Sequence, residues 1–158
     1  MAATESKKQV GLRGEDLACA ELERQGMQIL ERNWRCRLGE IDVVAAETGP
    51  NGLTLVFCEV KCRSGLGFGH PLEAITYAKM RTLRQLAAVW MREHRVRASS
   101  IRLDAIGVVL ARSAAPSVTH AATRPGTASD TEKRCCLMRR EGGAPDQETP
   151  HSRSGDSR

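Results

Sequence analysis

The sequence predicts an α/β domain in which helices flank a mixed β-sheet, with the elements in the order α-β-β-β-α-β. Three observations predict this class. Two stretches, around Leu22 and Leu86, repeat apolar residues at helical spacing. Runs rich in β-forming residues lie between and after these stretches. The length of 158 residues suits one domain.

Composition separates a folded part from a tail. All five aromatic residues lie within residues 1–112, whereas residues 113–158 contain none and hold four of the six prolines. The tail offers only Val118, Leu137 and Met138 as sizeable aliphatic residues. Burying so little apolar surface cannot offset the entropy lost on ordering. We therefore predict a domain over residues 10–112 and a disordered tail over residues 113–158.

The first helix is predicted over Arg13–Gln25, because Gly26 follows in a position typical of a helix end. Met27–Trp34 is predicted as the first strand and Glu40–Glu47 as the second. On one side of the predicted first helix, at the spacing of a helical repeat, lie Leu12, Glu15, Cys19 and Leu22.

Thr48–Gly52 is dense in turn-forming residues and precedes a third predicted strand, Leu53–Arg63. This short turn predicts an antiparallel hairpin. After the glycine-rich loop Ser64–His70, a helix is predicted over Leu72–Arg95, followed by a strand over Ser100–Leu110. A strand, a helix and a further strand predict a parallel pair joined by a right-handed crossover. The predicted inward stripe of this helix is Leu72, Ile75, Lys79, Leu83, Leu86 and Trp90.

Several classes of protein are excluded by what the sequence lacks. No apolar run reaches the length of a membrane span, and Met1–Gln9 has no apolar core of a secretory signal. We therefore expect a cytoplasmic protein that makes no membrane contact and keeps its six cysteines reduced. The cysteines show no C-x-x-C spacing, which argues against a structural zinc site.

Two carboxylates fall where a buried hairpin would place them face to face. With the turn centred near Pro50, Asp42 lies almost opposite Glu59. At about 4 Å, their repulsion is on the order of 4 kcal/mol. A shared proton or a cation would relieve it, and Mg²⁺ suits a site built from carboxylates and water.

Further charged residues accompany this pair. Lys61 shares a strand face with Glu59, while Glu15 and Lys79 lie on the inward stripes of the two helices. Such a group could polarise a phosphodiester and activate water. Other interpretations stay open: Glu59 and Lys61 as a surface pair, Glu15 as a carboxylate favoured by the helix dipole, and Lys79 extending its ammonium to solvent.

These positions resemble those of a known family. The matching residues are Gly14-Glu15 with Ala18, Asn33, Gly39-Glu40-Ile41-Asp42, Phe57-Cys58-Glu59-Val60-Lys61-x-Arg63, Lys79 and Arg102-x-Asp104. They resemble the motifs of the bacterial YraN family, which is similar to the restriction-endonuclease-like PD-(D/E)xK nucleases, including archaeal Holliday-junction resolvases. The resemblance covers about residues 10–110, and the chain departs from the family pattern after Leu110.

The resemblance implies a restriction-endonuclease-like fold and a DNA substrate. It implies Asp42, Glu59 and Lys61 as catalytic residues, joined by Glu15, with Mg²⁺ or Mn²⁺ held by the three carboxylates. Resolvase-like nucleases often act as dimers on branched DNA, so a homodimer is a further expectation. The residues expected to contact DNA phosphates are Arg35, Arg37, Arg63 and Lys79.

Three functions remain in competition. The leading hypothesis is a metal-dependent endonuclease that cuts structured or branched DNA in repair or recombination. A non-catalytic nucleic-acid-binding module with the same fold is the alternative, supported by the net charge of +5. Nucleotide binding at Gly65–Gly69 has weaker support, because the glycine spacing lacks the features of a P-loop or dinucleotide site.

Overall fold

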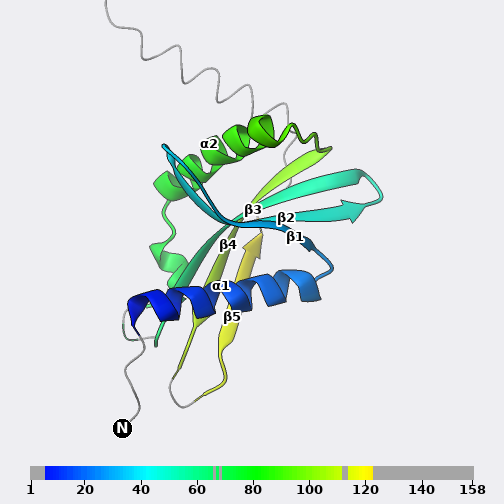
Figure 1. Ribbon diagram of the computed structural model, residues 1–158. Coiled ribbons are helices and arrows are strands. Elements are labelled where there is room, and N and C mark those ends of the chain that lie inside the picture. The colour runs from blue at the N-terminus through cyan, green and yellow to red at the C-terminus, as the bar shows by residue number, and fades with distance from the viewer. Residues whose placement is uncertain (1–5, 66, 68, 112–113, 123–158) are drawn as a thin grey trace, which may run out of the picture.

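The computed structural model describes residues 6–65, 67, 69–111 and 114–122, which form one mixed sheet with a long helix on each face (Figure 1). The predicted class and the order α-β-β-β-α-β are confirmed, with one more strand at the end, and the arrangement is consistent with a restriction-endonuclease-like fold. The elements are α1 (Lys7–Arg24), β1 (Gln28–Cys36), β2 (Gly39–Gly49), β3 (Gly52–Arg63), the 3-10 helix η1 (Pro71–Ala74), α2 (Tyr77–His94), β4 (Ser100–Val109) and β5 (Ser117–Ala122).

The strand order in the sheet is β1-β2-β3-β4-β5. The β2–β3 hairpin is antiparallel, and β3 and β4 are parallel, so both predicted pairings are confirmed. The hairpin turn is tighter than the predicted Thr48–Gly52, because Gly49 pairs with Gly52 and leaves two residues between them. The positive φ of Gly52, 98°, is a backbone conformation that glycine adopts without steric cost.

The prediction of disorder from residue 113 onward is wrong for β5. This strand pairs antiparallel with β4, and its Val118 packs against the buried residues on the α1 side. Little in the local sequence marks this strand, since four of its six residues are exposed. Residues 123–158 of the predicted tail, with Cys135 and Cys136, lie outside the described residues, as do Leu66 and Phe68 of the glycine-rich loop.

Helix α1 begins six residues before the predicted start, because Ser6 and Gln9 form a reciprocal capping box. Its buried face also differs from the prediction, since Leu12 is 47% exposed. The residues that are buried are Gly14, Ala18, Cys19 and Leu22. A Cβ atom on Gly14 would lie 2.5 Å from the Cβ of Cys62, so the missing side chain lets α1 pack directly on β3.

The predicted helix Leu72–Arg95 is two helices. The chain is extended at Ile75, and the side chain of Thr76 then caps α2 by accepting the Lys79 amide. Of the predicted inward stripe, Leu83, Leu86 and Trp90 are buried. The other three members differ from the prediction: Leu72 and Ile75 precede α2 and are half-buried, and Lys79 is exposed.

Each face of the sheet carries its own buried cluster, one under α1 and the other under α2. On the α2 side Phe57 meets Trp90 edge to face, and Trp90 donates its indole N–H to Glu31 of β1 at 2.7 Å. In the described part of the chain, Cys19, Cys36, Cys58 and Cys62 form no disulfide. Among the described residues, no helix has the length and apolar character needed to cross a membrane.

Candidate active site

The predicted carboxylates meet where the β2–β3 ladder ends. That ladder runs from Gly49 and Gly52 to the pair Val43 and Cys58, so the register places Asp42 opposite Glu59, as the sequence predicted. Beyond this point the Asp42 side chain takes over from the ladder, since its Oδ2 accepts the Val60 amide at 2.7 Å. One carboxylate is therefore fixed to the backbone of the strand that carries the other.

The regular alternation of β2 side chains between the two faces of the sheet is interrupted at Asp42. Ile41 belongs to the buried cluster under α2, whereas Val43 belongs to the cluster under α1. On the neighbouring strand, Asn33 lies opposite Asp42 and has a left-handed φ of 54°. Asparagine tolerates that conformation better than most residues. Asn33, Asp42 and Glu59 thus lie in one row across three strands.

Glu15 joins this row from α1. Asn33 donates its side-chain N–H to Glu15 Oε2 at 2.7 Å. The nearest cation is Arg32, whose Nη2 is 3.9 Å from that oxygen but makes its shorter bond, 2.7 Å, to Asp16. The Glu15 side chain is 17% exposed, so it lies at the edge of the buried face of α1 and reaches the sheet through Asn33.

The pKa of Asp42 is raised by its burial and, to a smaller extent, by neighbouring negative charge. Burial raises it from 3.8 to about 6; the Val60 amide acts in the opposite direction, and the charges of Glu59, Glu15 and Glu40 add to the increase. Four carboxylates are therefore close enough to interact. An ionised Asp42 at neutral pH is costly in this arrangement.

Lys79 supplies the positive charge closest to this group. Its Nζ lies 2.5 Å from Oε1 of Glu59, whose side chain is only 17% exposed. The hydrogen bond to Glu59 raises the pKa of Lys79, which keeps the amine protonated. Lys61, by contrast, is partly buried and makes no ion pair within the described part of the chain. The sequence placed Lys79 on the inward stripe of the helix, and the structure places it beside Glu59.

The donor set has the chemistry of a hard divalent cation site. Asp42 and Glu59 offer carboxylate oxygens, and Mg²⁺ commonly binds one or two carboxylates and completes its shell with water and phosphate. The expected three-carboxylate set is not assembled: within residues 6–122, as far as they are described, no group of three His, Cys, Asp or Glu side chains is close enough to hold a metal ion. The residues therefore fit a two-carboxylate site of Asp42 and Glu59, whereas Glu15 is hydrogen-bonded to Asn33.

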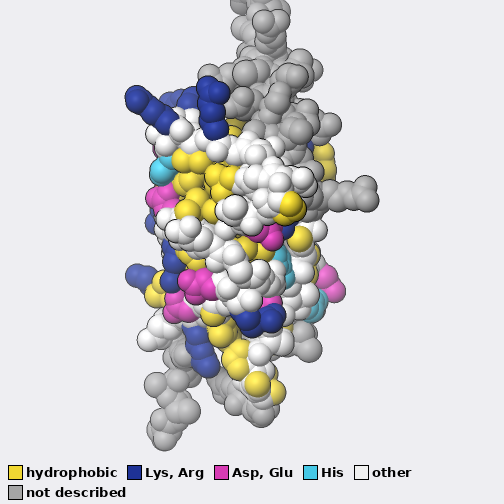
Figure 2. All heavy atoms as spheres, turned by 90° about the vertical axis from the view of Figure 1, so that its right-hand side faces the viewer, with side chains coloured by type: hydrophobic (Ala, Val, Ile, Leu, Met, Phe, Trp, Pro, Cys, Tyr) yellow, Lys and Arg dark blue, Asp and Glu magenta, His cyan; other side chains and the backbone are white. Residues whose placement is uncertain are grey.

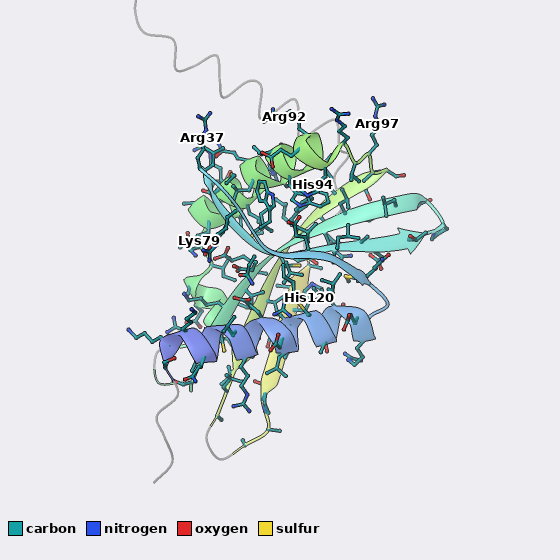
Figure 3. The ribbon with its side chains drawn as sticks, viewed as in Figure 1. Arg37, Lys79, Arg92, His94, Arg97 and His120 are labelled. Carbon is teal, nitrogen blue, oxygen red and sulfur yellow. The ribbon has the colours of Figure 1, made fainter. Side chains whose placement is uncertain are left out.

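The residues predicted to contact DNA are distributed unevenly around this group. Arg35 pairs with Glu40 at 3.0 Å on the surface, and Arg37 projects from the β1–β2 turn away from Lys79 (Figure 3). Arg63, on the same face of β3 as Glu59 and Lys61, has a buried Nε with no hydrogen-bond partner in the described structure. On the face that forms the right-hand side of Figure 1, acidic and basic side chains are interspersed (Figure 2).

A second polar cluster lies on the α1 side of the sheet; its Arg102 and Asp104 are among the residues that match the family, but no role was predicted for them. Asp104 is fully buried and accepts from Arg102 Nε at 3.0 Å, while its Oδ2 lies 2.7 Å from His120 Nε2. Arg102 also donates to Glu47 at 3.0 Å. The strand alternation of Arg102 and Asp104 could have indicated a shared face, but nothing local in the sequence marks His120.

Comparisons with known proteins all point to one family. Residues 14–108 match Uncharacterised protein family UPF0102. A UPF0102 protein of Mycobacterium ulcerans strain Agy99 is 48% identical over 117 residues, covering 74% of this chain and 94% of that relative. A UPF0102 protein of Clavibacter michiganensis subsp. michiganensis strain NCPPB 382 is 47% identical, covering 71% of this chain and 92% of its own.

A UPF0102 protein of Rhodococcus opacus strain B4 is 45% identical over 111 residues, 70% of this chain and 91% of its own. These identities extend over nearly the whole of each relative. The resemblance drawn from the motifs around Asp42 and Glu59 is thereby confirmed. The chain belongs to the uncharacterised protein family UPF0102, the YraN family.

Proposed function

We propose that this protein is a metal-dependent endodeoxyribonuclease that hydrolyses phosphodiester bonds in structured or branched DNA, with a role in repair or recombination. The observation that carries the proposal is the placement of Asp42 opposite Glu59 at the open end of a buried hairpin. Two carboxylates so placed destabilise the fold unless a cation or proton joins them. Such a costly pair is more typical of a functional site than of a structural one.

Asp42 and Glu59 would hold Mg²⁺ or Mn²⁺, with Glu15 reaching the cation through a water molecule or by releasing Asn33. When bound, the cation would polarise the phosphodiester and lower the pKa of attacking water. Lys61 would stabilise the attacking water or the developing negative charge. Lys79 would release Glu59 and contact a DNA phosphate. Arg63 and, farther from the carboxylates, Arg35 and Arg37 would contact further phosphates.

Cleavage assays on defined DNA substrates test this function. The full chain is incubated with flaps, four-way junctions and linear duplex, with Mg²⁺, with Mn²⁺ or with EDTA. We expect metal-dependent cutting of a branched substrate that falls by at least about 100-fold in Asp42→Ala and Glu59→Ala. Asp16→Ala is the matched control, because Asp16 is an exposed carboxylate on α1 that bonds Arg32. Cutting that persists in both site variants would exclude these residues as the catalyst.

The second candidate is a nucleic-acid-binding module without catalysis. Two observations favour it: Glu59 is already engaged by Lys79, and the described residues assemble no three-carboxylate site. This function predicts binding that weakens steeply with salt, and no cleavage of any substrate. Lys79→Met separates the two functions. If Lys79 substitutes for a cation, its removal will enlarge the increase in melting temperature caused by Mg²⁺; a binding module will show no Mg²⁺ response in either protein.

A further inference from the structure

Tyr77 stands apart from the other described aromatic residues. Trp34, Phe57 and Trp90 are 8%, 0% and 2% exposed and form part of the core under α2, whereas Tyr77 is 86% exposed. It is the first residue of α2. The core therefore derives almost nothing from this ring, which presents both its faces to solvent.

Basic residues continue the face on which Tyr77 lies. Arg81 and Arg84 follow it at spacings of four and seven residues, which places the three on one side of the helix. The whole of α2 contains four Lys and Arg residues and a single acidic residue, Glu93, in its last turn. An aromatic ring followed by cations along one surface is the combination that binds a single nucleic-acid strand, in which bases stack and phosphates pair.

The ring also lies at the end of α2 that meets the candidate site. Lys79, two residues along α2 and on the opposite side of the helix from Tyr77, contacts Glu59 of β3. A strand that lies on Tyr77 would thus pass about one helix diameter from Glu59. A paired base is enclosed in the duplex stack, so a ring on a convex helix surface can stack only on an unpaired base.

We propose that the outer face of α2 binds an unpaired DNA strand, with Tyr77 stacking on a base and Arg81 and Arg84 contacting phosphates. Delivery of that strand to Asp42 and Glu59 rests on the proposed nuclease function, whereas the binding itself does not. The favoured substrates are accordingly those with a single-stranded arm next to a duplex, such as flaps, over fully paired four-way junctions.

Binding is measured by fluorescence anisotropy in EDTA, so that cleavage plays no part. The probes are labelled oligo(dT) and a blunt duplex of equal length, and the full chain is used. We expect Tyr77→Ala to raise the Kd for oligo(dT) by about 5- to 100-fold, and the Kd for duplex by less than about twofold. Tyr77→Phe keeps the ring and stays within about twofold of wild type. Leu30→Ala is the matched control, because Leu30 is an exposed apolar residue of β1.

A second measurement observes the ring directly. The chain has one tyrosine, so incorporation of 3-fluorotyrosine gives a single fluorine resonance that belongs to Tyr77. We expect oligo(dT) to shift this resonance more than the duplex does at equal phosphate concentration. Unchanged oligo(dT) affinity in Tyr77→Ala, or equal losses for both probes, would overturn the proposal. Failure of cleavage in Mg²⁺ together with the expected Tyr77 results would reject only the nuclease function.

Discussion

Asp42 is subject to two opposing effects. Its bond to the Val60 amide favours the carboxylate, while burial and the charges of Glu59, Glu15 and Glu40 favour the protonated acid. The second group prevails, because the pKa rises to about 6. A buried carboxylate with so perturbed a pKa is more typical of a functional site than of one that only stabilises the fold.

The sign of this shift predicts how stability depends on pH. Because the pKa of Asp42 is raised from 3.8 to about 6 by folding, the folded state binds the proton more tightly. The contribution to stability is fully present below pH 4 and is lost as the pH rises through 6. Asp42→Asn keeps an acceptor for Val60, so it should stabilise the metal-free protein at pH 7.5 by up to about 3 kcal/mol, with no gain at pH 4. Urea unfolding at both pH values measures this, and a pH-independent difference would contradict it.

The same variant tests cation binding. In millimolar Mg²⁺ the melting temperature of the wild type should rise, because the cation binds only the folded site. Asp42→Asn should lose most of that rise, whereas Asp16→Asn, on the exposed side of α1, should keep it. Thermal melts followed by circular dichroism give the comparison. Equal metal-induced shifts in the wild type and Asp42→Asn would show that Asp42 is not a ligand.

At the scale of the elements, the site depends on how closely α1 approaches β3. Glu15 reaches Asn33 because its neighbour Gly14 lies against Cys62 with no side chain between them. Helix α2 positions Lys79 in a similar way, since the extended residue Ile75 and the Thr76 cap start the helix beside Glu59. The middle of α1 and the first turn of α2, one on each side of the sheet, thus flank one end of the hairpin.

Two glycines of α1 provide a matched test of this approach. A Cβ on Gly14 would lie 2.5 Å from Cys62 Cβ, whereas a Cβ on Gly11 would meet nothing within 4 Å. Gly14→Ala should therefore cost about 1–3 kcal/mol of unfolding free energy through overpacking. Gly11→Ala should gain up to about 1 kcal/mol from helix propensity. Urea denaturation of both variants decides, and a stabilised Gly14→Ala would mean that α1 does not pack as described.

At the scale of the whole molecule, the buried carboxylate of Asp104 links β5 to the rest of the domain. His120 of β5 and Arg102 of β4 both bond Asp104, and Arg102 extends the network to Glu47 of β2. The strand itself buries little apolar surface. The edge of the sheet is therefore held to the centre by polar contacts as much as by packing.

This network gives a prediction for the whole fold. Asp104→Ala leaves Arg102, whose side chain is 12% exposed, without its buried partner, and should destabilise the protein by about 3–5 kcal/mol. His120→Ala should cost about 1–3 kcal/mol, since it removes one bond to a buried carboxylate. Glu47→Ala is the control, because the Glu47 side chain is 41% exposed and its loss should cost at most about 1 kcal/mol. A cost for Asp104→Ala as small as that for Glu47→Ala would contradict the network.

Local sequence signals predicted most of the fold and part of the site. Strand alternation and the turn near Pro50 were enough to place Asp42 opposite Glu59, because hairpin register follows from the position of the turn. The helical repeat located three of the buried residues of α2, Leu83, Leu86 and Trp90, but placed the exposed Lys79 on the same stripe. The same repeat misplaced Leu12, which is 47% exposed although it lies one heptad from the buried Cys19, because periodicity gives the direction of a side chain and not whether the sheet covers that turn of the helix.

The sequence by itself determined the fold class, the element order as far as β4, the hairpin that carries the carboxylates and the family. These depend on periodicity and on neighbours along the chain. Only the tertiary structure decided that Lys79 contacts Glu59, that Asn33 joins Glu15 to the row containing Asp42, and that His120 secures β5 to Asp104. Those contacts join residues 16 to 20 positions apart on different elements, and packing alone fixes which side chains meet across that separation.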